Sequence, residues 1–302
     1  MDRLAGELGA CRTGELARVH GAGPHFGEEA PLVGRGGSGT IFSAGCNLDC
    51  VFCQNHDISH PLEDRALTVT AVGRAPESGA RRGSGRAAAE EPGRGARQAH
   101  PRWAESPEYV ARQMLGMQAL GCENINLVSP SHVVPQILVA LVLAAEGGLR
   151  LPLVYNTGGY DALPTLDLLD GVIDIYMPDM KYADNEVGER LSGVYGYASR
   201  NRVAVREMHR QVGDLALDER GVAQRGLLVR HLVLPGGLAG TAAIARFLAT
   251  EVSPDTYINV MDQYRPAHRA NWHPEISRRP TVAEYEAAVD AVRDAGLSRL
   301  DH

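Results

Sequence analysis

The sequence is poor in several features that mark particular classes of protein. No run of 18 or more apolar residues occurs in its 302 residues, and residues 1–21 lack the apolar stretch of a signal peptide. Lysine is almost absent, because 29 of the 30 basic residues are Arg and only Lys181 is Lys. We therefore expect a cytoplasmic protein without membrane spans. Its one Lys either survives by chance or is needed as a compact ammonium.

The sequence also has no excess of basic over acidic residues. The 37 acidic and 30 basic residues give a formal net charge of -7, which leaves no electrostatic footprint for nucleic acid or an anionic membrane. With 44% apolar and 22% charged residues, the chain can bury the core of one large domain. Five cysteines are too few for a disulfide framework, and three of them fall within eight residues. This clustering favours a metal site in a reducing compartment.

One segment, residues 73–101, contains no Val, Ile, Leu, Met or aromatic residue, but six Arg and three Glu. Because it cannot bury a hydrophobic face, we expect a disordered Gly/Ala/Arg-rich surface insertion. An Arg-rich arm that docks on an acidic partner is the alternative. The rest of the chain is expected to comprise an N-terminal extension over 1–36 and a core barrel over 37–72 and 102–302 that ends in a helix.

Outside the insertion, short aliphatic runs alternate with amphipathic helical patterns, as in βα units around a parallel sheet. Six strands are predicted, at residues 39–44, 124–128, 151–156, 172–177, 227–234 and 257–261. Helices are predicted after Ser106-Pro107, over 133–148, over 240–252 and after Thr281. Six units are too few for a closed eight-stranded barrel, so we predict an α/β fold built as a partial (β/α)6 TIM-like barrel. Polar motifs follow all six strands, which predicts one shared active-site mouth at their carboxyl ends.

Three of the cysteines, Cys46, Cys50 and Cys53, form a C-x3-C-x2-C motif after the first predicted strand. Three thiolates can bind three irons of a four-iron four-sulfur cluster and leave the fourth iron open to a substrate or cofactor. A structural zinc ion would need a fourth ligand, for which His56 or His60 is available. The spacing favours the cluster over zinc.

The motif, with the aromatic Phe52 before its last Cys, resembles the radical S-adenosylmethionine (radical SAM) superfamily. Longer segments resemble, more narrowly, its pyruvate formate-lyase activating enzyme-like subgroup: SGTIFSAGCNLDCVFCQNHDIS, NINLVSPSH, LPLVYNTGGYDAL, DGVIDIYMPDMKY, VREMHRQVG, GLLVRHLVLPG and MDQYRPAH. The likeness runs from about Cys11 to the C-terminal helix and is interrupted only by the insertion. It implies a partial barrel of the radical SAM type.

The resemblance implies an oxidoreductase with two cofactors, a 4Fe-4S cluster and S-adenosyl-L-methionine. The cofactor is held on the open iron and is reductively cleaved to methionine and a 5′-deoxyadenosyl radical, which abstracts a hydrogen atom from the substrate. The implied partner is a one-electron donor of the flavodoxin or ferredoxin type. Activation of a glycyl-radical enzyme and modification of a small molecule or peptide both fit the subgroup. From a different class, a non-catalytic iron-sulfur electron carrier or redox sensor is the alternative, but it would not need the polar motifs after the other strands.

The resemblance also assigns candidate residues. Cys46, Cys50 and Cys53 match the metal ligands. Cofactor-binding positions are matched by Phe52, Ser129, Ser131, His132, Asn156, Gly158, Asp179, Lys181 and Pro235. Substrate candidates are Arg230, His231, Gln263, Tyr264 and Arg265, with a satisfied core histidine as the alternative for His231. Residues 129–132 depart from the Gly-Gly-Glu motif of the superfamily, because they offer no carboxylate to the methionine ammonium.

Four further residues are assigned no chemistry. Tyr176 and Tyr195 are expected to pack, and Cys122 is expected to be a small buried hydrophobe. Members of the subgroup often begin with a Cys-rich segment, of which Cys11 remains in this chain. We expect Cys11 to be a free thiol, in a segment whose other cysteines were lost or lie upstream of Met1.

Overall fold

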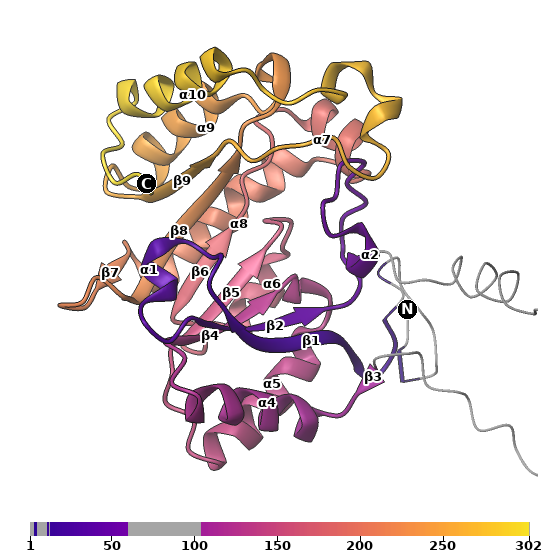
Figure 1. The fold of residues 1–302 in the computed structure, drawn as a ribbon, viewed down its shortest axis with the longest axis vertical. Coiled ribbons are helices and arrows are strands. Elements are labelled where there is room, and N and C mark those ends of the chain that lie inside the picture. Colours follow the sequence, from indigo (N-terminus) through magenta and orange to yellow (C-terminus); the bar gives the residue numbers. More distant parts are fainter. Residues whose placement is uncertain (1–2, 5–10, 12, 60–103, 302) are drawn as a thin grey trace, which may run out of the picture.

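Six parallel strands form the centre of the fold in a computed structural model, which describes residues 3–4, 11, 13–59 and 104–301. They are β2 (Ser38–Ser43), β4 (Asn124–Val128), β5 (Leu153–Thr157), β6 (Ile175–Pro178), β8 (Ala223–Leu232) and β9 (Tyr257–Met261). They correspond to the six predicted strands, with ends shifted by up to four residues. The predicted insertion at 73–101 and His60 lie outside the described residues. The α/β class is confirmed (Figure 1).

Three short or Gly-rich strands extend this sheet through antiparallel pairings. They are β1 (Ala17–His25), which pairs with β2, β3 (Ala104–Glu105), which pairs with β1, and β7 (Ala216–Leu217), which pairs with β8. The strand order is β3-β1-β2-β4-β5-β6-β8-β7, with β9 also beside β8. In the described part of the chain the sheet does not close on itself. β1 was not predicted, because ARVHGAGPH lacks an aliphatic run, and it makes the expected N-terminal extension part of the sheet.

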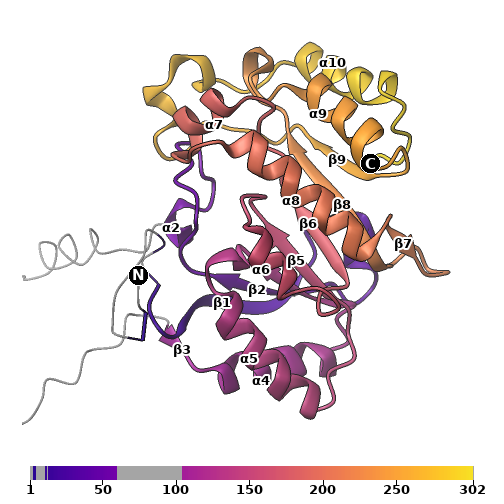
Figure 2. The ribbon, with the colours of Figure 1, turned by 180° about the vertical axis from the view of Figure 1, so that it is seen from behind.

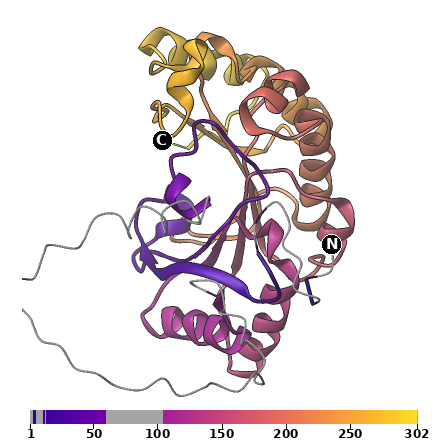
Figure 3. The same cartoon turned by 90° about the vertical axis from the view of Figure 1, so that its right-hand side faces the viewer.

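Helices cover the convex side of this curved sheet, and the N-terminal segment lies on its open side (Figures 2 and 3). The longer ones are α4 (Pro107–Ala119), α5 (Val134–Glu146), α7 (Asn185–Ser192), α8 (Tyr197–Val212) and α10 (Val282–Asp294). The short ones are α1 (Ala30–Val33), α2 (His56–Ser59), α6 (Leu163–Asp167) and α9 (Thr241–Phe247). None of the helices within the described ranges has the length and apolar character needed to cross a membrane.

Local signals account for the helix starts that the sequence predicted. The side chain of Ser106 caps α4 with Pro107 in its first turn, and Thr281 and Glu284 form a reciprocal capping box at the start of α10. The predicted helix over 240–252 is present as α9 followed by a π-turn over Leu248–Val252. Both α7 and α8 were not predicted.

The two faces of the sheet differ because successive strand residues point to opposite sides. Outward residues such as Tyr155, Tyr176 and Val229 pack against the helices. On the inner face, the first half of the strands is apolar, and Leu32 of α1 packs there against Val154, Ile175 and Leu228. Towards the carboxyl ends the same face becomes polar, with Asn126, Asn156, Asp179, Arg230 and Asn259. Strand alternation thus directs the polar side chains to one end of the inner face.

Two packing predictions are confirmed and one is wrong. Tyr176 is fully buried, and Cys122 is 3% exposed among the helix-facing residues. Tyr195 is 77% exposed instead of packed, because it lies in the turn between α7 and α8. The aromatic character of Tyr195 alone did not predict that its ring would be exposed.

Leu32→Ala is expected to lower the free energy of unfolding by about 2 to 5 kcal/mol, because Leu32 is fully buried in the apolar half of the inner face. Leu120→Ala is the matched control, since Leu120 is 69% exposed, and it should change this free energy by less than about 0.5 kcal/mol. Urea unfolding followed by circular dichroism measures both. Equally small effects would contradict the packing of α1 into the sheet.

Candidate functional site

The loop after β2, residues 45–55, carries the three motif thiols and is called the Cys loop below. Its backbone N–H groups at Asp49 and Val51 donate to carbonyls in the last turn of α7, at 3.0 and 2.9 Å. The carbonyl of Val51 accepts the N–H of Arg269, in the segment after β9, at 2.8 Å. Figure 1 shows this loop between α2 and α7 with the segment after β9 beside it. Elements from two distant parts of the chain, α7 and the segment after β9, therefore fix the loop.

Cys46, Cys50 and Cys53 are free thiols, and each sulfur has a different polar neighbour. Cys50 Sγ lies 3.0 Å from the hydroxyl oxygen of Ser192, and Cys53 Sγ lies 3.2 Å from that of Ser59. Cys46 Sγ accepts a backbone N–H at 3.4 Å. All three sulfurs are therefore placed by hydrogen bonds within or next to the Cys loop.

The three thiols interact electrostatically with one another, and Cys46 and Cys50 also interact with Lys181. Burial raises the pKa of Cys46 to about 12, and the neighbouring Cys50 adds to this rise. Burial also raises the pKa of Cys50, while the positive charge of Lys181 opposes the rise. A buried thiolate at Cys50 needs a compensating cation, which Lys181 or a metal centre can supply.

The donor set offers three thiols, which is the ligand number of an open iron-sulfur cluster and one ligand short of a closed zinc site. In the ranges that the structure covers, no group of three or more His, Cys, Asp or Glu side chains is arranged to hold a metal ion. Each thiolate of a cubane cluster binds a different iron, so the three sulfurs need not converge on one atom as zinc ligands must. His56, which would complete a zinc site, stacks on His268 and lies 3.3 Å from a carboxylate oxygen of Asp57.

A partly buried ionic cluster lies beside the Cys loop at the ends of β6 and β8, with side chains of Asp179, Lys181 and Arg230 that are 18%, 18% and 23% exposed. Lys181 Nζ is 2.6 Å from Asp179 Oδ2, and Arg230 Nε is 3.5 Å from Asp179 Oδ1. Burial alone would lower the pKa of Lys181, but the carboxylate of Asp179 outweighs it and raises this pKa. Lys181 therefore stays charged, and Asp179, Lys181 and Arg230 are brought together as the sequence predicted.

Four further polar residues of this region were not predicted. Glu29 Oε1 lies 3.4 Å from Arg230 Nε and accepts a hydrogen bond from the amide of Asn259 at 2.9 Å. Asn126 lies beside Glu28, whose pKa is raised by burial. The Asn residues inside the apolar strands NINLV and YINVM could have predicted a polar inner face from the sequence. The position of Glu28 and Glu29 could not be predicted, because they reach this face from just before α1, far away in the sequence.

Ser131 and His132 hold the scaffold together. Ser131 Oγ lies 2.9 Å from Thr157 Oγ1, and Thr157 donates to the buried carboxylate of Asp161 at 2.7 Å. His132 Nε2 lies 3.0 Å from the carbonyl oxygen of Ala44, so that nitrogen carries the proton. Burial lowers the pKa of His132 to about 4, which keeps it neutral. Both residues tie the end of β4 to its neighbours, and His132 supports the start of the Cys loop.

Ser129, Asn156 and Gly158 lie at the ends of β4 and β5, and each has a different role there. Ser129 has a left-handed backbone with φ 53°, and its N–H donates to the carbonyl of Asn156 at 2.8 Å. Asn156 Oδ1 accepts from an Arg230 guanidinium nitrogen at 3.5 Å. A Cβ at Gly158 would lie 2.7 Å from Leu48 Cδ1 of the Cys loop. Gly158 therefore lets the loop approach β5 closely.

Phe52 of the Cys loop and Tyr264 of the segment after β9 belong to one buried apolar cluster. Phe52 is 4% exposed, and its ring meets that of Tyr264 edge-on with centroids 5.6 Å apart. The hydroxyl of Tyr264 donates to the carbonyl of Ile276 at 2.6 Å. Pro235 is buried at the turn after β8. These side chains stabilise the wall of the site.

The remaining substrate candidates do not lie together. His231 is fully buried, with Nδ1 2.7 Å from the Met180 carbonyl oxygen and Nε2 2.8 Å from Thr241 Oγ1. Both its nitrogens are thus satisfied, as the core-histidine alternative expects. Gln263 and Arg265 are exposed on the segment after β9.

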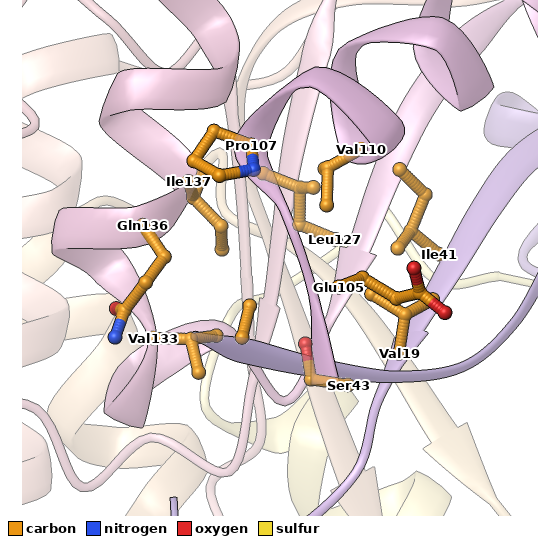
Figure 4. A pocket seen from close by; sticks show the side chains of 11 residues that line it. Val19, Ile41, Ser43, Glu105, Pro107, Val110, Leu127, Val133, Gln136 and Ile137 are labelled. Carbon is orange, nitrogen blue, oxygen red and sulfur yellow. The ribbon is translucent and has the colours of Figure 1, made fainter. Parts of the chain in front are cut away.

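Two hollows lie away from the ionic cluster. One, of about 10 Å³, lies between the sheet and helices α4 and α5, where mostly apolar side chains such as Val110, Leu127 and Ile137 point into it (Figure 4). It has room for about one water. The other, of about 760 Å³, lies between N-terminal residues and α5 and is lined partly by Ser131 and His132.

Fold and site together define the chain as an α/β protein with a three-thiol loop and an ionic cluster at the carboxyl ends of its parallel strands. No family model matches the chain. It is 31% identical over 280 residues to the uncharacterized protein MJ0674 of Methanocaldococcus jannaschii, a match that covers 91% of this chain and 67% of that protein. The chain belongs to the same family as that protein.

Protonation of His132 is expected to reduce the free energy of unfolding as the pH falls from about 6.5, the ordinary His pKa in an unfolded chain. Because its folded-state pKa is about 4, the folded protein binds fewer protons than the unfolded chain below pH 6.5 and loses stability down to pH 4. This loss amounts to about 2 to 3 kcal/mol.

His132→Gln keeps a donor for the Ala44 carbonyl and removes the titration, so its unfolding free energy should fall less over the same pH range. Urea unfolding at a series of pH values measures both proteins. Identical slopes would show that His132 does not stay neutral in the folded state.

Proposed function

We propose that the protein is a radical S-adenosylmethionine enzyme, similar to the pyruvate formate-lyase activating enzyme-like subgroup, whose open sheet serves as a partial (β/α)6 TIM-like barrel. One observation carries the proposal: three thiols, of which Cys50 is buried and Cys46 and Cys53 are partly buried, lie near the Asp179–Lys181 pair at the carboxyl ends of the parallel strands. An electron carrier needs the thiols, but it has no use for a charged pair and a polar inner face beside them.

In this proposal Cys46, Cys50 and Cys53 hold the 4Fe-4S cluster. When bound, the cluster supplies the electron that cleaves S-adenosylmethionine to methionine and the 5′-deoxyadenosyl radical that abstracts hydrogen from the substrate. The last turn of α7 and the ring of Tyr264 pack against the Cys loop and keep water away from Cys50, which is 8% exposed. The protein thus contributes orientation and exclusion of solvent.

Lys181 has the clearest task among the cofactor candidates. Asp179 keeps it protonated and orients it at 2.6 Å, so it presents a compact positive charge that suits the carboxylate of the methionine moiety. Asn156, at the end of β5, adds an amide beside Arg230. The substrate would then face Arg230 and the inner carboxylates of Glu28 and Glu29. A glycyl-radical enzyme and a small molecule or peptide both suit this arrangement, with a flavodoxin- or ferredoxin-type protein as electron donor.

Anaerobic reconstitution with iron and sulfide, followed by reduction, is expected to give 5′-deoxyadenosine from S-adenosylmethionine, quantified by liquid chromatography. Cys46→Ala, Cys50→Ala and Cys53→Ala should each abolish its formation, because each removes one ligand. Cys122→Ala is the matched control, since this thiol lies buried among the helix-facing residues, and it should leave the yield unchanged. A fully assembled, reduced cluster without cleavage would contradict the proposal and favour an electron carrier.

Lys181→Met is expected to weaken binding of S-adenosylmethionine about tenfold or more, which corresponds to loss of one charge-assisted interaction. Iron and sulfide content should stay at the wild-type level, because Lys181 is not a ligand. Anaerobic equilibrium dialysis measures the affinity, with Arg112→Met, an exposed cation on α4, as control. Unchanged affinity in Lys181→Met would leave this side chain as a structural partner of Asp179.

A further inference from the structure

Two buried hydroxyl groups form a chain that ends on the sulfur of Cys50. Tyr182 Oη lies 2.8 Å from Ser192 Oγ, which lies 3.0 Å from Cys50 Sγ. The exposed fractions of Tyr182, Ser192 and Cys50 are 1%, 0% and 8%. Water therefore has no access from which to replace either hydroxyl.

The direction of this chain follows from the chemistry of a thiolate ligand. A sulfur that has lost its proton can only accept, so the hydroxyl of Ser192 must donate to Cys50 Sγ. Each hydroxyl has one proton, and therefore the oxygen of Ser192 accepts the proton of Tyr182. Burial raises the pKa of Tyr182 well above its ordinary value, so this proton stays available.

Surrounding contacts hold both hydroxyls in place. Ser192 is the last residue of α7, and its carbonyl accepts the Asp49 N–H of the Cys loop at 3.0 Å. The ring of Tyr182 packs edge-on against Tyr197 and Phe52, with centroids 5.3 and 6.4 Å apart. The hydrogen-bond chain is thus fixed from the helix side and from the aromatic side.

Cys50 is singled out among the three thiols by this arrangement. The hydroxyl near Cys53 belongs to Ser59, and both residues are partly exposed. Cys46 Sγ accepts a backbone N–H at the longer distance of 3.4 Å. A buried hydrogen bond is electrostatically stronger than one that water can replace, so Ser192 has the largest effect on its sulfur.

We propose that Ser192, supported by Tyr182, raises the reduction potential of the iron-sulfur cluster bound through Cys50; this inference rests on the proposed function. Reduction adds one electron from the external donor to the cluster and its thiolates, with no bond to the protein made or broken. A hydrogen bond to a ligand sulfur stabilises this more negative state, and so favours reduction. Ser192 and Tyr182 are positioning residues, because they act through Cys50.

The test is a potentiometric titration of the anaerobically reconstituted protein, followed by electron paramagnetic resonance without S-adenosylmethionine. Ser192→Ala should lower the midpoint potential of the cluster by about 59 mV for one electron. At the midpoint potential of the wild-type protein, the ratio of reduced to oxidised cluster in the variant should therefore be about tenfold lower. Tyr182→Phe keeps the ring and should shift the midpoint in the same direction by less. Ser192→Thr retains a hydroxyl and should restore the wild-type value. Ser59→Ala is the matched control at Cys53 and should shift it least.

The outcomes separate this inference from the proposed function. A wild-type midpoint in Ser192→Ala, at full iron and sulfide content, would overturn the inference and leave the proposed function intact. A wild-type protein that assembles no cluster would overturn both. If Ser192→Ala itself fails to assemble the cluster, Tyr182→Phe decides, and an unchanged midpoint in that variant would overturn the inference.

Discussion

The partly buried carboxylate of Asp179 is the group around which the carboxyl ends of the parallel strands are organised. An isolated charge at this depth would be very costly, so it requires cations close by. Lys181 supplies one at 2.6 Å and Arg230 another at 3.5 Å. Each cation also meets a second partner, since Lys181 faces the thiol of Cys50 and Arg230 faces Glu29. One carboxylate thereby links the Cys loop to the polar inner face.

The backbone around Asp179 strengthens this link. Its carbonyl accepts hydrogen bonds from the Tyr197 hydroxyl at 3.1 Å and from the Asn201 amide at 2.9 Å. A Cβ at Gly159 would lie 2.2 Å from the same carbonyl, so glycine is required where β5 passes β6. The chemistry proposed for the Cys loop therefore depends on a scaffold in which β5, β6 and α8 are locked together.

Much of the fold could be predicted from local patterns. The aliphatic runs identified all six parallel strands, and the caps at Ser106 and Thr281 identified two helix starts. β1 was not predicted, because it is rich in Gly and has no aliphatic run; it pairs antiparallel with β2. Tyr195 was assigned to packing, whereas the turn that holds it exposes its ring.

The candidate site was predictable where function is concentrated in a short motif, as in the Cys loop. It was less predictable where contacts join distant segments. Glu29 meets Arg230 only because α1 crosses the sheet, and Ser192 meets Cys50 only because α7 ends above the loop. Neither contact could be predicted from the spacing of residues along the chain. Side-chain type also did not distinguish a scaffold role from a chemical one, as His132 and His231 show.

The most direct measurement is the X-ray absorption spectrum at the iron edge of the anaerobically reconstituted protein. The account predicts a sulfur shell around each iron together with iron-iron scattering, which only a multinuclear cluster produces, and the loss of both in Cys50→Ala. The account would be contradicted if the protein retained no iron and instead bound a single zinc ion. The zinc would then have a shell of sulfur and nitrogen ligands and no metal-metal scattering.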